Sequence, residues 1–230
     1  MLRLEALEIV QGAFHMTADM TLEQGQKYAV IGPSGAGKST LLGAMCGFVP
    51  LKAGHIFWQE KDITQANPGA RPMTMLFQDN NLFPHLSVTQ NVGLGIRPDL
   101  RLDAIQKSKV EDALERVGLS DQMDKKPGAL SGGQQSRAAL ARVLVQARPW
   151  VLLDEPFAAL GPALRNEMLD LVQDLVADTG AGLIMITHAP EDVQRIADQV
   201  IFVGSGKAEA PKPAMELMDN PPPELKAYLG

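Results

Sequence analysis

The stretch GPSGAGKST, residues 32–40, decides the fold of this chain. It follows the pattern G-x-x-x-x-G-K-[ST], with Gly32 and Gly37 as the two glycines and Lys38 before Ser39. The apolar run KYAVI in front of it predicts a strand, and STLLGAMCGF behind it predicts a helix. A glycine loop between a strand and a helix wraps phosphate groups with its backbone N–H groups. The stretch therefore predicts a phosphate-binding loop in an α/β protein.

Each residue of this loop is a candidate ligand of a nucleotide: Gly32, Pro33, Ser34, Gly35, Ala36, Gly37, Lys38, Ser39 and Thr40. We expect Lys38 to neutralise β- and γ-phosphate oxygens and the Ser39 hydroxyl to bind Mg²⁺. A chance glycine turn is the alternative, and the strand and helix on either side argue against it. The loop therefore predicts ATP and Mg²⁺ as the bound groups.

The run WVLLDEP predicts a strand buried on both faces of a parallel sheet, and it ends in two acids. A carboxylate at Asp154 is costly there unless it serves a cation or a hydrogen-bond network, so we expect it to hold Mg²⁺ through water. Glu155 follows and would face the γ-phosphate as a general base or a water-orienting group. The alternative is that both acids are exposed loop residues at the end of a strand.

Short apolar runs alternate with helical patterns along the whole chain. The expected strands are residues 2–9, 14–22, 27–31, 54–58 and 73–77, and the runs PWVLLDEP, GLIMIT and QVIFV. From about 84 to 147 the pattern turns helical, and the tail from about 214 predicts one or two short helices separated by NPPP. This order predicts a mainly parallel sheet with helices on both faces.

Two amphipathic helices are predicted in detail. In LDAIQKSKVEDALERVGL one apolar face is expected to hold Leu102, Ile105, Val110, Leu114 and Val117, and Gly118 is a plausible C-terminal cap. In PALRNEMLDLVQDLVADTG the helix is expected to begin at Pro162 and to end at Gly180.

Composition narrows the function. The chain has 230 residues, and its formal net charge of −6 argues against a bulk nucleic-acid binder. The single cysteine, Cys46, excludes an internal disulfide and is expected to be a small buried apolar residue. The N-terminus MLRLEALEIV does not resemble a signal peptide, and no stretch approaches the roughly 18 apolar residues of a membrane span. We therefore expect any work at a membrane to depend on other chains.

A second glycine pair lies in LSGGQQS, residues 130–136. It opens the run SRAALARVLVQA, which predicts a helix. Ser131, Gly132 and Gly133 could therefore offer a hydroxyl, backbone N–H groups and a helix dipole to an anion. A glycine-rich helix start with no ligand is the alternative.

In chain order the sequence carries GPSGAGKST, Gln78 in MLFQDN, LSGGQ, LLDEP and His188 in MITHAPED. This set resembles the ATP-binding subunits of ABC transporters over nearly the whole chain. Within that family, MLFQDNNLFPHLSVTQNVGLGI and the short tail look closest to the subunits of thiamine importers.

The resemblance implies a fold and an activity. The fold would be α/β, a P-loop NTPase core with a RecA-like parallel sheet, an N-terminal antiparallel β subdomain and a helical subdomain carrying LSGGQ. Residues 1–230 would form a single ATP-binding domain, with the helical subdomain at roughly 84–147. The chain would hydrolyse ATP to drive a membrane importer of thiamine or a related small solute.

The resemblance also implies partners. Two copies would stack head to tail, with each ATP between the glycine loop of one and Ser131, Gly132, Gly133 and Gln134 of the other. Gln78 would touch Mg²⁺ beside Ser39 and Asp154, and His188 would contact the γ-phosphate as a switch beside the catalytic Glu155. Transmembrane permease subunits would hold the chain at the cytoplasmic face of the cell membrane, and a periplasmic or extracellular solute-binding protein would act indirectly. No nucleic acid is expected. NNLFPHL would be a docking surface or a small local core.

The sequence departs from the family pattern at three positions. Gly161 replaces the usual aspartate of S-A-L-D, Ser136 stands where a long residue is common, and Ala189 stands where an acid is frequent. We expect the first change to affect communication between the two ATP sites rather than folding, since glycine is a tolerable helix N-cap. Phe14 is the candidate for stacking on adenine.

Two other classes of ATPase share these motifs. A DNA-repair or chromosome-structuring ATPase would need long coiled-coil arms, and residues 40–130 carry no sustained heptads. A non-transport assembly factor, such as one for iron–sulfur clusters, uses the same cassette, and the association with a membrane subunit would separate it from an importer.

Overall fold

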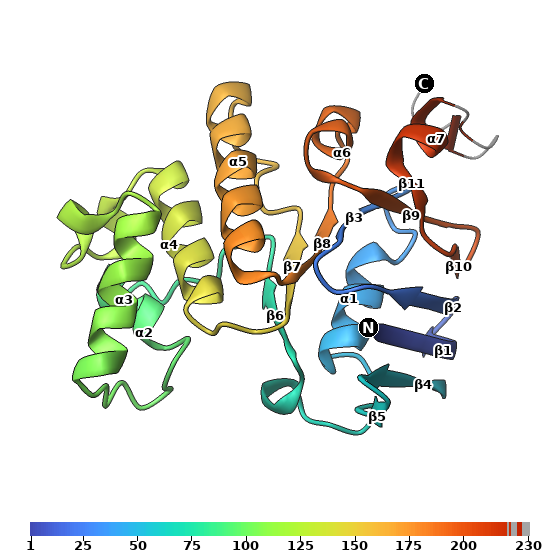
Figure 1. The fold of residues 1–230 in the computed structure, drawn as a ribbon, viewed down its shortest axis with the longest axis horizontal. Helices are drawn as coiled ribbons and strands as arrows, with labels where there is room; N and C mark the ends of the chain where they lie inside the picture. Colours follow the sequence, from blue (N-terminus) through green and yellow to red (C-terminus); the bar gives the residue numbers. More distant parts are fainter. Residues whose placement is uncertain (220, 222–224, 227–230) are drawn as a thin grey trace.

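In the computed structural model, which describes residues 1–219, 221 and 225–226, the chain forms one mixed sheet with helices on both sides (Figure 1). Within this described part the strand order is β5-β4-β1-β2-β10-β9-β3-β8-β7-β6, and β11 pairs with β9. The strands are β1 (Leu2–Gln11), β2 (Phe14–Leu22), β3 (Lys27–Ile31), β4 (Ala53–Trp58), β5 (Lys61–Asp62), β6 (Met73–Leu76), β7 (Trp150–Asp154), β8 (Gly182–Ile186), β9 (Gln199–Gly204), β10 (Lys207–Ala208) and β11 (Lys212–Pro213).

The parallel half of the sheet runs β9-β3-β8-β7-β6. All residues of β7 and β8 are buried, as are four of the five in β3. Continuous burial explains why these strands read as unbroken apolar runs in the sequence. Because the strands are parallel, the loops after β3, β6, β7 and β8 emerge at the same edge of the sheet.

The antiparallel half contains β1, β2, β4 and β5. Its pairing shifts register between Leu4 and Leu7, where Ala6 has a φ of 44°. The Ala6 N–H donates to a carboxylate oxygen of Asp19 at 3.1 Å, which satisfies the backbone at this bulge. The short β10 joins the halves, because it pairs parallel with β2 and antiparallel with β9.

The helices cover both faces of the sheet and extend into a further, helical core. They are α1 (Lys38–Cys46), α2 (Val88–Gly93), α3 (Ala104–Arg116), α4 (Gly132–Leu144), α5 (Pro162–Thr179), α6 (Pro190–Ile196) and α7 (Ala214–Asp219), with 3₁₀ turns at Pro68–Ala70, Ser120–Gln122 and Pro127–Ala129. Helix α1 packs in one apolar core with the antiparallel strands and Trp150 of β7. Helices α4 and α5 pack in a second core with β6, β7 and β8. The buried Cys46 on α1 confirms the expectation for the cysteine.

Helices α2, α3 and α4 share a third apolar core, on the left of Figure 1. Val110, Leu114 and Val117 are buried there as predicted, but the prediction for Ile105 was wrong, because its side chain is 71% exposed. Asp103 caps α3 with a reciprocal bond to Gln106, so the helix begins at Ala104 and its first turn points Ile105 away from the core.

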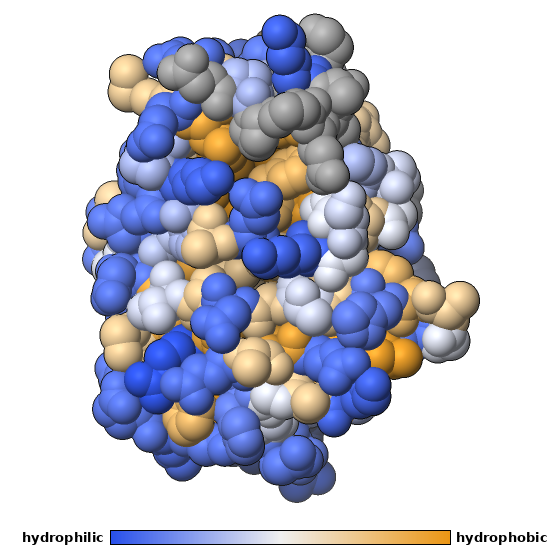
Figure 2. Space-filling model, turned by 90° about the vertical axis from the view of Figure 1, so that its right-hand side faces the viewer, coloured by the Kyte–Doolittle hydropathy of each residue, from blue (hydrophilic) through white to orange (hydrophobic). Residues whose placement is uncertain are grey.

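The α/β fold class predicted from the sequence is confirmed, including the parallel core and the antiparallel N-terminal strands. Gly161 and Gly180 bound α5 as predicted. The first tail helix is α7, and the predicted part of the tail around NPPP lies largely outside the described residues. Among the residues described, no helix has the length and apolar character needed to cross a membrane. Hydrophilic residues cover most of the side that holds β1, β2 and β4 (Figure 2), which is typical of a water-facing surface.

Candidate nucleotide site

The loop at residues 32–37 is shaped by two glycines that other residues could not replace. Gly32 has a φ of 147°, and a Cβ added there would collide with the backbone of Val203. Gly37 is the N-cap of α1 with a φ of 100°, and a Cβ there would meet the ring of Phe14. Both positions combine left-handed backbone with no room for a side chain, so the loop geometry depends on glycine.

Lys38 lies folded under this loop. Its side chain is buried, and Nζ donates to the carbonyl oxygens of Gly32 at 2.8 Å and Pro33 at 2.9 Å. Burial lowers the pKa of the Lys38 ammonium, and the nearby carboxylates of Glu155 and Asp154 oppose that shift. The ammonium is therefore held against the backbone carbonyls at the start of the loop. The tip, residues 33–35, is exposed.

Asp154 ends β7 directly beside the loop. Its side chain is buried, and it accepts a hydrogen bond from the Ser39 hydroxyl at 3.0 Å. Burial raises the pKa of the Asp154 carboxyl, while the bond from Ser39 and the Lys38 charge pull it down. A carboxylate and a hydroxyl oxygen in contact are a donor set that suits a hard divalent cation.

Glu155 and His188 meet next to this pair. His188 follows β8, and its Nε2 lies 2.6 Å from Glu155 Oε1. The Glu155 backbone has a φ of 47°, and its N–H donates to the carbonyl of Ile186 at 3.2 Å. A glutamate in the left-handed region carries a strain of order 1 kcal/mol or more, which at an active site is a sign of imposed geometry. The strand ends therefore fix both side chains in contact.

Gln78 follows β6 at the same edge of the sheet and is exposed. The predicted site residues thus come from three strand ends: the glycine loop follows β3, Asp154 and Glu155 lie at the end of β7, and His188 follows β8. One contact joins Ser39 to Asp154, and another joins Glu155 to His188. Gln78 shares the edge, and its side chain faces solvent. Thr40, inside α1, is half-buried.

The second glycine pair lies elsewhere. Ser131 is the N-cap of α4, where its hydroxyl accepts from the Gln134 N–H at 3.3 Å and its own N–H donates to the Gln134 side chain at 2.9 Å. A Cβ at Gly133 would collide with Leu164 of α5, whereas at Gly132 it would meet nothing within 4 Å. Figure 1 shows α4 well to the left of α1. The structure therefore does not bring Ser131–Gln134 to the loop of the same chain.

Three residues beside the site were not predicted from the sequence. Arg165, Thr187 and Asp192 make contacts of 2.5 to 3.3 Å with one another next to His188. A polar residue before the histidine and an acid five positions later were the only signals, and neither identifies a partner on a distant helix. Phe14, the candidate for stacking on adenine, lies partly buried against the loop at Gly37.

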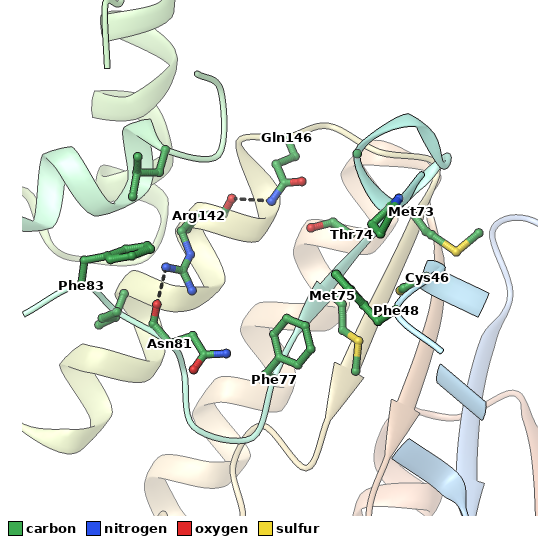
Figure 3. Close-up of a pocket in the computed structure, with 14 residues that line it drawn as sticks. Cys46, Phe48, Met73, Thr74, Met75, Phe77, Asn81, Phe83, Arg142 and Gln146 are labelled. Atoms are coloured by element: carbon green, nitrogen blue, oxygen red, sulfur yellow. Dashed lines mark hydrogen bonds between the residues drawn. The ribbon is translucent and has the colours of Figure 1, made fainter. Parts of the chain in front are cut away.

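A groove of about 650 Å³ runs between the sheet and the helical part (Figure 3). Its lining includes Phe48, Phe77 and Phe83, and the rings of Phe48 and Phe83 are about half exposed. Arg142 of α4 reaches into it and donates to the carbonyls of Asn80 at 2.6 Å and Asn81 at 2.7 Å. The loop after Gln78 is therefore tied to the helix that begins with the second glycine pair.

Comparison with known proteins agrees with this geometry. Residues 16–158 match the family model described as ABC transporter. The chain is 56% identical over its full length to the full length of a thiamine import ATP-binding protein, ThiQ, from Ruegeria sp. (strain TM1040), and also to that from Cereibacter sphaeroides. It is 46% identical, over 100% of its length and 95% of the relative, to the protein of that name from Brucella suis.

Solved structures give the same result. CbiO1 from Clostridium perfringens, part of the ABC transporter complex CbiONQ, superimposes with a TM-score of 0.84 at 28% identity, over 99% of this chain and 93% of that one. An ATP-binding cassette in a dimeric post-hydrolysis state, bound to ADP and Pi, superimposes with a TM-score of 0.81 at 24% identity, over 93% of this chain and 99% of that one, and shows the shared fold. On the family match and on the full-length identity to curated relatives, the chain belongs to the ABC transporter family.

Proposed function

We propose that this chain is the ATP-hydrolysing subunit of a thiamine importer. The observation that carries the proposal is the convergence of Lys38, Ser39, Asp154, Glu155 and His188 at one edge of the sheet. Full-length identity of 56% to thiamine import ATP-binding proteins favours thiamine as the transported solute. Residues 1–230 act as a single domain in this proposal.

The phosphates of ATP bind in the loop at residues 32–40. Its exposed tip offers backbone N–H groups, and α1 points its N-terminus at the loop. Phosphate oxygens would replace the carbonyls of Gly32 and Pro33 as the partners of Lys38 Nζ. Both of these carbonyls are neutral, so a charged phosphate would be the stronger acceptor for the ammonium.

Mg²⁺ fits the pair of Ser39 and Asp154. The two oxygens are 3.0 Å apart, and Asp154 is buried while Ser39 is exposed. Burial makes the carboxylate charge unfavourable, and a divalent cation would offset that cost. Gln78 would complete the set from its exposed position after β6. When bound, the cation withdraws charge from the β- and γ-phosphates.

Glu155 acts on the attacking water. Its strained backbone and its contact with His188 hold the carboxylate in one place, so it can orient the water and accept its proton. His188, the partner of Glu155 in that contact, would donate a hydrogen bond to the γ-phosphate. Its position would therefore depend on whether that phosphate is present. The pair forms the hydrolytic part of the site.

A second copy supplies the other half of each site. Ser131, Gly132, Gly133 and Gln134 lie at the open N-terminus of α4, away from the loop of their own chain. In a head-to-tail dimer they would face the γ-phosphate held by the partner's loop. The capping bonds use oxygen lone pairs of Ser131 and Gln134, so the Ser131 hydroxyl proton stays available for a phosphate oxygen.

Permease subunits dock in the groove of Figure 3. Half-exposed phenylalanine rings beside the Gln78 loop suit an apolar helix end from a membrane protein, and Arg142 would transmit its position to α4. With the permease docked in this way, the chain would lie peripherally at the cytoplasmic face of the membrane. The solute-binding protein acts on the far side and does not touch it.

The test of nucleotide binding is the Lys38→Ala variant. We expect the affinity for Mg²⁺ATP to fall at least about tenfold, since a buried charged contact to phosphate is lost. Titration calorimetry on the purified chain measures it, and Lys107→Ala, an exposed lysine on α3, is the matched control. Equal affinities in all three proteins would refute the phosphate assignment. Reconstitution with a permease and a thiamine-binding protein then tests the solute, because thiamine and no other solute should accelerate ATP turnover.

A further inference from the structure

Two ion pairs join α5 to α6, and they differ in burial. The Arg195 guanidinium of α6 holds Asp170 of α5 with two bonds, at 2.6 and 2.9 Å, and both side chains are exposed. Arg165 of α5 lies 2.5 Å from Asp192 of α6, whose side chain is only 7% exposed. The buried pair connects the first turns of both helices, close to the loops that carry Glu155 and His188.

The buried pair is closed by the hydroxyl of Thr187. This hydroxyl donates to Asp192 Oδ2 at 2.5 Å and accepts from Arg165 Nη2 at 3.3 Å and from the Ala189 N–H at 3.1 Å. Thr187 and Ala189 are the two neighbours of His188 in the chain. The backbone on both sides of the histidine is therefore attached to one buried network.

The same network borders the hydrolytic pair. A hollow of about 230 Å³ is lined by Glu155 and His188 together with Arg165, Thr187 and Asp192. Helix α5 begins directly after the loop that follows Glu155, and the Arg165 N–H bonds the carbonyl of Gly161 at the end of that loop. The network thus reaches both residues of the pair through the chain segments that hold them.

We propose that Arg165, Thr187 and Asp192 are positioning residues that keep His188 in contact with Glu155. This inference rests on the proposed hydrolysis of ATP at that pair. Among the described residues, no hydrogen bond or ion pair joins any of the three to the loop at residues 32–40, so we expect them to set the rate of hydrolysis and to leave the affinity for ATP unchanged. The exposed pair of Asp170 and Arg195 only fastens the two helices to each other.

These residues can position His188 because removing one of them leaves the others without a hydrogen-bond or ion-pair partner, which is energetically unfavourable. Asp192 is buried, so its carboxylate needs both the guanidinium and the hydroxyl, and a buried charge that loses a partner is strongly unfavourable. Without the hydroxyl, the N–H of Ala189 also loses its acceptor. The loop would then take other conformations, and His188 would spend less time against Glu155.

The experiment compares variants of the full-length chain in steady-state ATP hydrolysis. Thr187→Val keeps the shape of the side chain but removes the hydroxyl. We expect kcat to fall at least about tenfold while KM for ATP changes by less than about twofold. Thr187→Ser returns the hydroxyl and should restore kcat, and Asp170→Asn, the control in the exposed pair, should resemble the wild type.

A second measurement does not depend on catalysis. The ring signals of the four histidines are recorded by NMR, and the loss of one signal in His188→Ala assigns His188. We expect the His188 signal to shift or broaden in Thr187→Val and to stay unchanged in Asp170→Asn. An unchanged signal or an unchanged kcat in Thr187→Val would overturn the proposal, as would an equal loss in Asp170→Asn. A wild-type chain without ATP turnover would instead refute the proposed function, and the ring signals would still decide the positioning.

Discussion

Two segments of the chain place a glycine-rich loop in front of a helix, and they are built differently. In the first unit, residues 32–46, the loop folds over Lys38, and seven of the nine residues of the helix are buried. In the second unit, residues 131–144, Ser131 and Gly132 are exposed, and a capping box closes the helix start. The first unit is closed in the sense that Lys38 is bonded within its own loop, and the second is open in the sense that its first two residues face solvent.

The two units also differ in charge, and the charge indicates which of them could bind a phosphate without a partner. The first has an ammonium, a hydroxyl and two acids within its contacts, so it can hold both a phosphate and a cation. The start of the second, Ser131–Gln134, carries no charged side chain and offers only uncharged donors and a helix dipole worth about 0.3–1 kcal/mol. We therefore expect Ser131–Gln134 to bind a phosphate only when another surface holds that phosphate in place, as in the proposed dimer.

The largest expected effect concerns Cys46, which tests how closed the first unit is. Burial raises the pKa of the Cys46 thiol to about 12. Since only the thiolate reacts, alkylation by iodoacetamide at mildly alkaline pH should be about a thousandfold slower than for a free thiol. Mass spectrometry of the native chain measures the rate, and the same chain in guanidinium is the control. Fast labelling of the native protein would mean that α1 opens readily.

The same shift has a consequence for stability. The pKa of Cys46 is higher in the folded than in the unfolded chain, so the unfolded chain releases its proton first as the pH rises. The stabilisation is complete below the ordinary thiol pKa of about 8.5 and declines above it. Denaturant unfolding at neutral and alkaline pH measures this, and Cys46→Ala should weaken the decline.

The Glu155→Gln variant tests whether the second unit of one copy binds against the first unit of another copy in the proposed dimer. In Glu155→Gln the amide keeps its shape but cannot accept a proton, so ATP turnover should fall about a hundredfold or more. ATP should still bind and should hold a lasting dimer, which light scattering after size exclusion detects. Glu111→Gln, an exposed acid on α3, is the control. A variant that binds ATP and stays monomeric at all concentrations would argue against the proposed dimer.

The two glycines of the second unit separate folding from assembly. Gly133→Ala should lower the free energy of unfolding by about 1 kcal/mol, because its Cβ would push aside the half-buried Leu164 side chain. Gly132→Ala has open space around it and should fold as well as the wild type, yet it should weaken the ATP-dependent dimer. Urea unfolding and light scattering measure the two effects. Equal destabilisation by both substitutions would contradict the packing of α4 on α5.

The smallest effect is expected at Gly161. Its φ of −67° is ordinary and no atom lies within 4 Å of an added Cβ, so aspartate fits there. An acid before Pro162 would cap α5 and interact with its dipole, which stabilises the chain by about 0.3–1 kcal/mol. Thermal unfolding should therefore show a slight rise in Tm or none. In reconstituted transporter we expect Gly161→Asp to raise the cooperativity of ATP hydrolysis, and an unchanged Hill coefficient would show that this acid does not couple the sites.

The sequence by itself determined the central sheet, and it named the residues from which the proposed site is built. Strands buried on both faces, such as β7 and β8, need continuous apolar runs, and the glycine loop needs its spacing, so both can be recognised locally. Gly180 at the end of α5 and Gly118 after α3 are local signals of the same kind, because the left-handed backbone there favours glycine. Features of this kind can be predicted from the sequence because a few neighbouring residues are enough to form them.

Only the tertiary structure decided what depends on distant partners. The short β10 exists because β2 and β9 lie on either side of it, and the side of α3 that faces the core follows from how α2 and α4 pack on it, which left Ile105 outside. The contact between Glu155 and His188, and the network of Arg165 with Asp192, join residues that are 33 and 27 positions apart. Hydrogen bonds and ion pairs of this kind depend on the relative position of packed helices and strand ends, and no local sequence pattern records that position.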